Sequence, residues 1–205
     1  MKVFISGGCK SGKSLYAQQL CQRMRKEGAP LYYLATMIPA DEEDNARVAR
    51  HRKDREGCGF KTVEVGCDVV AAVDRCDKRG TILLDSVTAL LSNVMFAPSD
   101  GEMSELSDGE MFDPSGGEIS EYRVNHDAHV KTAADLTEIM GRLDNIVIIS
   151  DFIYSDAFLY DDLTETYRRS LAYIDKQVAR CSDVVLEFCA GNCIPHKGTE
   201  LLLQC

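Results

Sequence analysis

The sequence lacks any apolar run that approaches the ~20 residues of a membrane-spanning helix. It is also poor in cations, with 23 Lys and Arg against 33 Asp and Glu, a net charge of -10 and a pI of about 4.9. Such an acidic chain is not expected to bind nucleic acid or an anionic membrane surface. An anionic ligand such as a nucleotide must therefore be held locally, by a loop, a metal ion and a few cations.

Features of an exported protein are also missing. A strand is predicted almost at the first residue, so residues 1–8 do not read as a signal peptide. The nine cysteines are odd in number and scattered through predicted helices and strands, which is typical of reduced thiols. We therefore expect a cytoplasmic protein, and the length of 205 residues predicts a single domain over residues 1–205.

A glycine-rich motif stands near the start of the chain and fits the pattern G-x-x-x-x-G-K-[ST]. A short apolar strand is predicted before it and an amphipathic helix after it, at residues 15–26. Backbone N–H groups of such a turn and the positive end of the helix dipole can hold phosphates, Lys13 can reach the terminal phosphates, and Ser14 can ligate Mg²⁺. The nucleotide-binding residues predicted from the motif are Gly7, Gly8, Cys9, Lys10, Ser11, Gly12, Lys13 and Ser14.

Strands and helices alternate along the rest of the chain. Continuous apolar strands are predicted at residues 31–36, 81–85, 145–150 and 183–188, with a shorter strand at 62–65. Helices are predicted at 41–55, 68–77, 86–96, 128–143 and 159–181. This alternation predicts an α/β fold of the P-loop NTPase type, in three layers with a mainly parallel central sheet. Ligands of such sheets bind at the carboxyl ends of the strands, where the loop, Thr36, Asp85 and Ser150 should gather.

Two residues outside the motif could take part in chemistry. Asp85 ends an apolar strand and could orient Mg²⁺, although a carboxylate there could instead cap the following helix. His51 lies among arginines and lysines on a predicted helix, where nearby cations would lower the pKa of its imidazole and keep it neutral and nucleophilic. Taken alone, His51 could equally be a solvated histidine on a charged helix.

Residues 97–121 interrupt the alternation. They are rich in Gly, Ser, Asp and Glu, and we interpret them as an acidic loop inserted into the domain.

Several stretches together resemble one known family. Residues 6–14 resemble its pattern [ST]-G-G-x-[RK]-S-G-K-S, residues 47–52 resemble R-I-x-x-H-[RK], and residues 83–93 resemble L-L-D-C-[LI]-T-x-[LW]-[LV]-[ST]-N. The family is the bifunctional adenosylcobinamide kinase / adenosylcobinamide-phosphate guanylyltransferase of cobalamin biosynthesis. The resemblance covers residues 1–96 well and returns at 179–191.

The resemblance implies specific roles. His51 would attack the α-phosphate of GTP, expel pyrophosphate and carry GMP as a phosphoramidate, which passes to adenosylcobinamide phosphate. Lys13 would act with His51 in catalysis, and Ser14 and Asp85 would hold Mg²⁺. The resemblance also implies a homo-oligomer, expected to be a trimer. Beyond the loop, the implied nucleotide-binding residues are Thr36, Met37, Ile38, Arg52, Lys53, Asp54, Arg55, Glu64 and Asp85.

The second half departs from the family pattern. Residues 150–154 read S-D-F-I-Y where the family usually has S-N-E-V-G, and Asp175-Lys176 stands where N-Q would fall. Two other functions stay open on this ground: a plain P-loop small-molecule kinase, and a nucleotide-binding protein without turnover. The choice between GTP and ATP is also open.

Overall fold

The computed structural model describes residues 1–39, 41–96 and 124–204. Within these ranges, the side chains of Glu43, Arg47, His51, Asp54, Leu203 and Gln204 lie outside the described part. The predicted acidic insertion at 97–121 lies outside the described residues as well.

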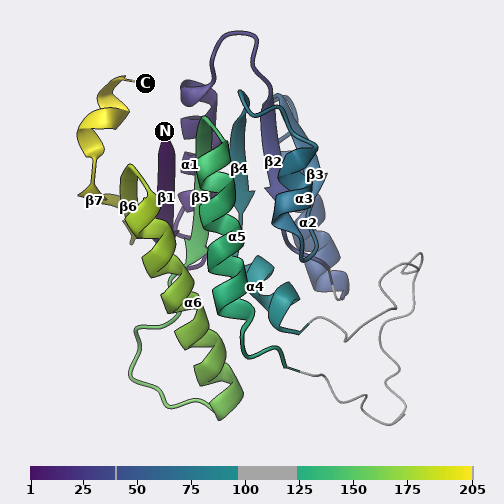
Figure 1. Cartoon of the computed structure of the whole chain (residues 1–205), viewed down its shortest axis with the longest axis vertical. Coiled ribbons are helices and arrows are strands. Elements are labelled where there is room, and N and C mark those ends of the chain that lie inside the picture. Colours follow the sequence, from purple (N-terminus) through teal and green to yellow (C-terminus); the bar gives the residue numbers. More distant parts are fainter. Residues whose placement is uncertain (40, 97–123, 205) are drawn as a thin grey trace.

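The described residues form a seven-stranded sheet with the order β3-β2-β4-β5-β1-β6-β7 (Figure 1). Strands β1 to β6 run parallel, and β7 pairs antiparallel with β6 at one edge. The strands are β1 Lys2–Gly7, β2 Leu31–Ala35, β3 Phe60–Glu64, β4 Thr81–Asp85, β5 Asn145–Asp151, β6 Val184–Cys189 and β7 Asn192–Lys197.

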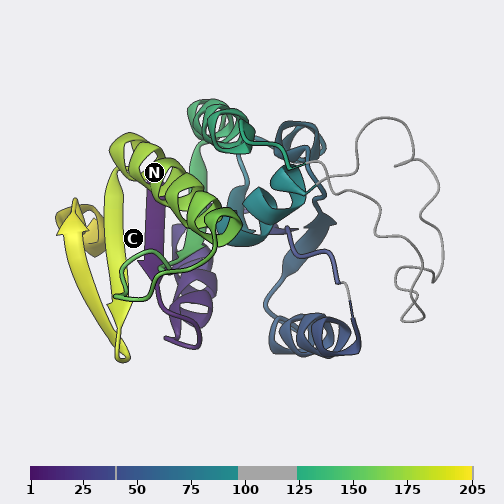
Figure 2. The same cartoon turned by 90° about the horizontal axis from the view of Figure 1, so that it is seen from below.

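Helices cover both faces of the sheet, which gives three layers (Figure 2). Helices α1 and α2 lie on one face, and α3 to α6 lie on the other. The helices are α1 Lys13–Met24, α2 Glu42–Asp54, α3 Val69–Asp74, α4 Val87–Met95, α5 Ala128–Arg142 and α6 Asp162–Cys181, followed by the 3₁₀ helix η1 Thr199–Gln204.

An apolar core lies on each face of the sheet. Successive residues of a strand point to opposite faces, so Phe4 joins the core under α3–α6 while Val3 and Ile5 join the core under α1. Because both faces are covered, the central strands are continuously apolar, as in β5, whose first six residues are all buried. Burial of each such Leu or Ile side chain contributes about 1.5–3 kcal/mol to the stability of the fold.

The registers place three strand ends close together. Strand β5 lies between β1 and β4; it aligns Asp151 with Gly7 of β1 and Ile149 with Asp85 of β4. Adjacent strands are about 4.8 Å apart, so the start of the phosphate loop and Asp85 are separated by roughly two strand spacings. Asp151 lies on the strand between them.

The structure confirms the predicted fold class and corrects some elements. The helix predicted at 159–181 begins at Asp162, because the carboxylate of Asp161 accepts hydrogen bonds from the N–H groups of Leu163 and Thr164 and caps it. The helix predicted at 68–77 spans only Val69–Asp74. Strand β7 and η1 were not predicted; β7 contains Pro195, which removes a backbone donor and is tolerated because β7 is an edge strand.

Candidate active site

The phosphate-loop motif forms a turn between the end of β1 and the start of α1. Gly7 fits where no side chain could, since a Cβ there would lie 2.5 Å from the carbonyl oxygen of Phe188 on β6. Lys10 and Gly12 adopt left-handed backbone angles, with φ of 57° and 91°. Among the described residues, the buried Oγ of Ser11 has no hydrogen-bond partner. The turn therefore ends in a helix N-terminus with unused polar groups, the arrangement that holds phosphates.

Lys13 is the first residue of α1, and only 7% of its side chain is exposed. Its ammonium group donates to Oδ1 of Asp151 at 2.6 Å and to the carbonyl oxygen of Gly8 at 3.1 Å. The sequence reasoning did not single out Asp151. The signal that could have found it is its position, directly after a buried strand and at the same sheet edge as the loop.

Asp85 ends β4 and does not cap the helix that follows. That role belongs to Ser86, whose Oγ accepts from the N–H of Ala89. Asp85 instead accepts a 3.0 Å hydrogen bond from the hydroxyl of Tyr33 on β2. Burial, reinforced by the Asp85 carboxylate, raises the pKa of Tyr33, so the phenol stays neutral and donates. The guanidinium carbon of Arg55 lies 3.5 Å from the centroid of the Tyr33 ring, a cation–π contact that helps to hold the ring in place.

Thr36 follows β2 and is fully buried. Its hydroxyl donates to the carbonyl oxygen of Ser86 at 2.8 Å and accepts from the Ser86 N–H at 2.6 Å. Its own carbonyl oxygen accepts from Nδ2 of Asn93, which also bonds the carbonyl oxygen of Gly66. Thr36 therefore binds the ends of β2 and β4 together, and its side chain is engaged within the protein.

A cavity of about 750 Å³ lies between α2 and the carboxyl ends of β2, β3 and β4. It joins predicted site residues from four separate segments of the chain. The predicted site residues that line it are Met37, Ile38, Arg52, Lys53, Arg55, Glu64 and Asp85. Residues 7–14 do not line it, so loop and cavity are adjacent regions with Asp85 at the border.

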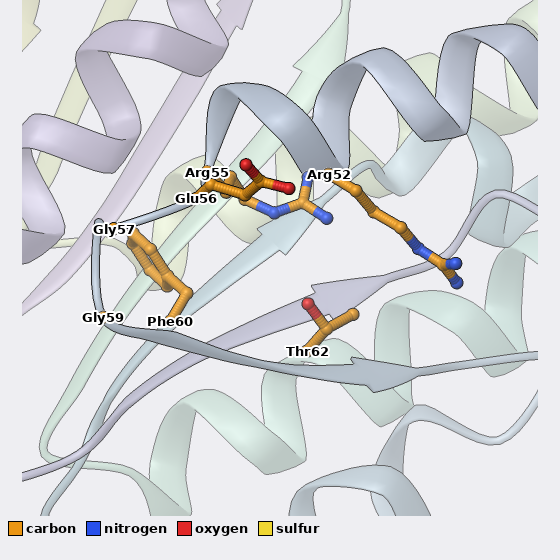
Figure 3. Close-up of a pocket in the computed structure, with 7 residues that line it drawn as sticks. All are labelled: Arg52, Arg55, Glu56, Gly57, Gly59, Phe60 and Thr62. Atoms are coloured by element: carbon orange, nitrogen blue, oxygen red, sulfur yellow. The ribbon is translucent and has the colours of Figure 1, made fainter.

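A smaller cavity of about 420 Å³ lies beside the end of α2 (Figure 3). Arg52 and Arg55 line both cavities. Arg52 pairs with Glu64 of β3, and both side chains are more than half exposed. Arg55 is buried, and its Nη1 has no hydrogen-bond partner among the described residues. The end of α2 thus brings two guanidinium groups to the border of the site.

For His51 and Asp54, two predicted site residues, the structure describes the backbone alone. The backbone of His51 and Asp54 lies in α2, within the segment whose Val48, Arg52 and Lys53 border the larger cavity. The side chains of His51 and Asp54 are outside the described part of the structure.

A buried carboxyl group lies behind the loop edge. The hydroxyls of Ser150 and Tyr154 both donate to Oδ2 of Asp175 at 3.0 Å. Burial raises the pKa of Asp175 to about 7, against the effect of these two hydrogen bonds. Asp175 was noted in the sequence only as a departure from the family pattern, and periodicity could not show that α6 turns it inward.

The oxygen donors of the site suit a hard cation. Mg²⁺ takes one or two carboxylates or hydroxyls together with substrate phosphates and water. Ser14 offers a hydroxyl, and Asp85 offers a carboxylate with a second oxygen besides the one that accepts from Tyr33. No cluster of three or more His, Cys, Asp or Glu suited to a metal occurs in residues 1–39, 41–96 and 124–204. The residues thus fit a cation that arrives with phosphates rather than one held by protein alone.

Comparison with known proteins identifies the family. A family model described as cobinamide kinase / cobinamide phosphate guanyltransferase matches residues 3–195. The chain belongs to this family. The resemblance seen in residues 1–96 therefore extends over nearly the whole chain, including the segments that depart from the pattern.

Two curated relatives in the cobinamide kinase / guanyltransferase family have similar sequences. The bifunctional adenosylcobalamin biosynthesis protein CobU of Salmonella typhimurium is 30% identical over 99 residues, and that of Escherichia coli is 31% identical over 98. Each match covers 47% of this chain and 51% of the relative. The chain thus spans about half the length of the curated relatives it matches.

Solved structures resemble the chain more distantly. The flagellar accessory protein FlaH of Methanocaldococcus jannaschii has a TM-score of 0.46 at 13% identity, covering 95% of this chain and 77% of FlaH. A KaiC-like protein of Pyrococcus horikoshii has a TM-score of 0.43 at 12% identity, covering 96% of this chain and 78% of that protein. None of the helices in the described ranges is long and apolar enough to cross a membrane.

Proposed function

We propose that this chain phosphorylates adenosylcobinamide and then transfers GMP from GTP to adenosylcobinamide phosphate, as a step of cobalamin biosynthesis. The observation that carries the proposal is the cavity beside α2, which gathers Arg52, Lys53 and Arg55 next to Asp85. A single nucleotide can then extend from the phosphate loop, past Asp85, into this cavity. Three cations in one short helical segment of a chain with net charge -10 favour an anionic ligand there.

The guanylyl transfer would proceed in two displacements through His51. An imidazole nitrogen of His51 attacks the α-phosphorus of GTP, an N–P bond forms, and the bond to the pyrophosphate oxygen breaks. An oxygen of the phosphate on the acceptor then attacks the same phosphorus, and the N–P bond breaks to restore the imidazole. Dividing the transfer in this way is the usual gain from covalent catalysis. Arg52 and Lys53 would balance the negative charge that develops on the phosphates.

The kinase step would use the loop. A hydroxyl oxygen of adenosylcobinamide attacks the γ-phosphorus of GTP or ATP, and the bond to the β-phosphate oxygen breaks to release the diphosphate. Lys13 would hold the terminal phosphates, and the backbone N–H groups of residues 8–14 would surround them. Ser14 and Asp85 would hold Mg²⁺, which when bound neutralises charge on the phosphates.

Further expectations accompany this function. We propose that Met37, Ile38, Asp54 and Glu64 complete the nucleotide site, with the Glu64 carboxylate accepting from guanine N–H groups. Thr36 would support this site by joining the ends of β2 and β4 rather than by contacting the nucleotide. We also propose a cytoplasmic homo-oligomer, of which a trimer is the expected form.

Labelling with α-³²P-GTP and Mg²⁺ tests the His51 proposal. We expect an acid-labile, alkali-stable protein adduct, with pyrophosphate released in equal amount. The adduct should be lost in His51→Ala and kept in the control His129→Ala, which removes a half-buried histidine on α5. An absent adduct in the wild-type protein, or an adduct that survives in His51→Ala, would overturn the mechanism.

A plain P-loop kinase remains a second candidate, because the loop is completely formed and does not line the α2 cavity. Transfer of γ-³²P to a cobinamide acceptor that is lost in Lys13→Ala, together with no α-³²P adduct in the wild-type protein, would favour it. Saturable GTP binding without release of pyrophosphate or GDP would instead favour a nucleotide-binding protein without turnover.

A further inference from the structure

The carboxylate of Asp151 lies where the phosphate loop would receive its ligand. It accepts from the Lys13 ammonium at 2.6 Å, and Gly8 accepts a second N–H of the same group at 3.1 Å. An ammonium group has three N–H donors, so two are already used in this arrangement. A terminal phosphate that reaches Lys13 must therefore share the ammonium with Asp151 or displace it.

Asp151 is held firmly in this place by its backbone. It is the last residue of β5, aligned with Gly7 of β1. Its N–H donates to Oγ1 of Thr88 on α4 at 3.0 Å, and the N–H of Phe152 donates to the carbonyl oxygen of Gly7 at the same distance. Since the strand is fixed on both sides, the carboxylate can move away only by rotating its side chain.

A fixed carboxylate beside bound phosphates has an electrostatic consequence. Like charges repel more strongly where the surroundings exclude water, and the Lys13 side chain is only 7% exposed. Metal-free GTP would bring its full negative charge against Asp151, whereas a nucleotide that carries a divalent cation brings much less. Asp85 lies on the far side of β5, roughly two strand spacings from the loop, so its charge acts on phosphates in the loop more weakly than that of Asp151.

We propose that Asp151 makes the phosphate loop select metal-bound nucleotides and reject metal-free nucleotides and free phosphate. The inference rests on the proposed nucleotide site but not on the His51 chemistry. Asp151 acts here through charge and through Lys13 and is a positioning and selectivity residue, not a catalytic one. Its role is opposite to that of Asp85: Asp151 weakens binding without metal, while Asp85 strengthens binding with it.

Dissociation constants of GTP measured by calorimetry, with Mg²⁺ and with EDTA, separate the two carboxylates. Asn keeps the shape of Asp151 and its acceptor oxygen for Lys13 but removes the charge. In Asp151→Asn we expect metal-free GTP to bind about 10-fold more tightly, while binding of Mg²⁺-GTP changes by less than about 3-fold. In Asp85→Asn we expect the reverse: weaker Mg²⁺-GTP binding and little change in EDTA.

Two more variants keep the test decisive. Asp151→Glu retains the charge and should retain weak metal-free binding, while Asp151→Ser is a second neutral variant should Asp151→Asn fail to fold. Inorganic tripolyphosphate, measured in EDTA, should follow the metal-free GTP results, because it presents a chain of three phosphates to the loop without a base. The proposal would be overturned if the neutral variants bound metal-free GTP with unchanged affinity. It would also be overturned if they lost affinity for GTP equally with and without Mg²⁺.

Failure of the Asp151 proposal can be distinguished from failure of the proposed guanylyl transfer. A wild-type chain that binds Mg²⁺-GTP but forms no His51 adduct would refute the guanylyl mechanism and leave the Asp151 proposal standing. Suppose instead that the wild-type chain forms the His51 adduct but its neutral Asp151 variants bind metal-free GTP no more tightly than the wild type. That result would support the guanylyl mechanism and overturn the Asp151 proposal.

Discussion

The hydroxyl of Tyr33 donates to Oδ2 of Asp85 across 52 positions of the sequence, and the guanidinium group of Arg55 lies over the tyrosine ring. The contact connects the end of α2, which borders the cavity, to the carboxylate that we propose for Mg²⁺. A hydrogen bond of this kind sets the direction of a ligating oxygen before the cation arrives.

Removal of that hydroxyl should therefore weaken metal-dependent binding. In Tyr33→Phe we expect the Mg²⁺ concentration that half-saturates GTP binding to rise about 10-fold, as is typical when a group supporting a metal ligand is lost. Tyr32→Phe is the matched control: Tyr32 is the neighbouring residue of β2, and its hydroxyl accepts from the N–H of Asp77, away from the site. A Mg²⁺ titration that shifts equally in both variants would contradict the role of Tyr33.

Gly7 should tolerate no side chain. In Gly7→Ala the new Cβ would lie 2.5 Å from the carbonyl oxygen and 2.9 Å from the Cβ of Phe188, so β1 or β6 must shift. We expect the free energy of unfolding in urea to fall by about 1–3 kcal/mol, the usual cost of overpacking. Gly8→Ala is the control, because a Cβ there meets no atom of the described residues within 4 Å. A loss in Gly8→Ala as large as that in Gly7→Ala would show that the contact with Phe188 is not the cause.

Asp175 should make stability depend on pH. Its pKa is about 7 in the folded protein and near 3.9 in the unfolded chain, so between these values the folded state binds more protons. The stabilisation is present in full below pH 4 and is lost as pH rises through 7, by an amount on the order of 4 kcal/mol at most.

Asp175→Asn tests this dependence, because an amide oxygen can accept the same bonds from Ser150 and Tyr154 without titrating. Urea unfolding at pH 5 and pH 8 should show a smaller fall in stability in Asp175→Asn than in the wild type. Glu27→Gln, at an exposed carboxylate, should keep the wild-type difference. An unchanged difference in Asp175→Asn would refute the assignment.

Glu64 should affect base selectivity more than stability. Its ion pair with Arg52 is exposed at both side chains, so Glu64→Gln should change the free energy of unfolding by less than about 1 kcal/mol. If the carboxylate accepts from guanine, GTP affinity should fall about 10-fold while ATP affinity stays the same. Glu56→Gln, which alters a second carboxylate lining the same cavity, is the control. Equal losses for GTP and ATP would exclude a guanine contact.

Much of the fold could be predicted because it depends on local patterns. The strand at 81–85 was predicted at its exact bounds, since three consecutive apolar residues between Thr81 and Asp85 are typical of a strand buried on both faces. Strand β7 was missed because an edge strand needs no apolar pattern and tolerates Pro195. The start of α6 was placed too early because its true start depends on the cap at Asp161.

The site divides in a similar way. The loop could be recognised from spacing, because its motif residues all lie within eight consecutive positions. The partners of its functional side chains could not: Asp151 lies 138 positions from Lys13, and Tyr33 lies 52 positions from Asp85. Such pairs depend on strand order and register, which no local pattern encodes.

The sequence by itself determined the phosphate loop, the alternation that makes the sheet parallel, and the family to which the chain belongs. The tertiary structure alone decided that β5 lies between β1 and β4, and therefore that Asp151 contacts Lys13. The physical reason is that periodicity and turn geometry are set by neighbours along the chain, whereas the charge a phosphate meets is set by neighbours across the sheet.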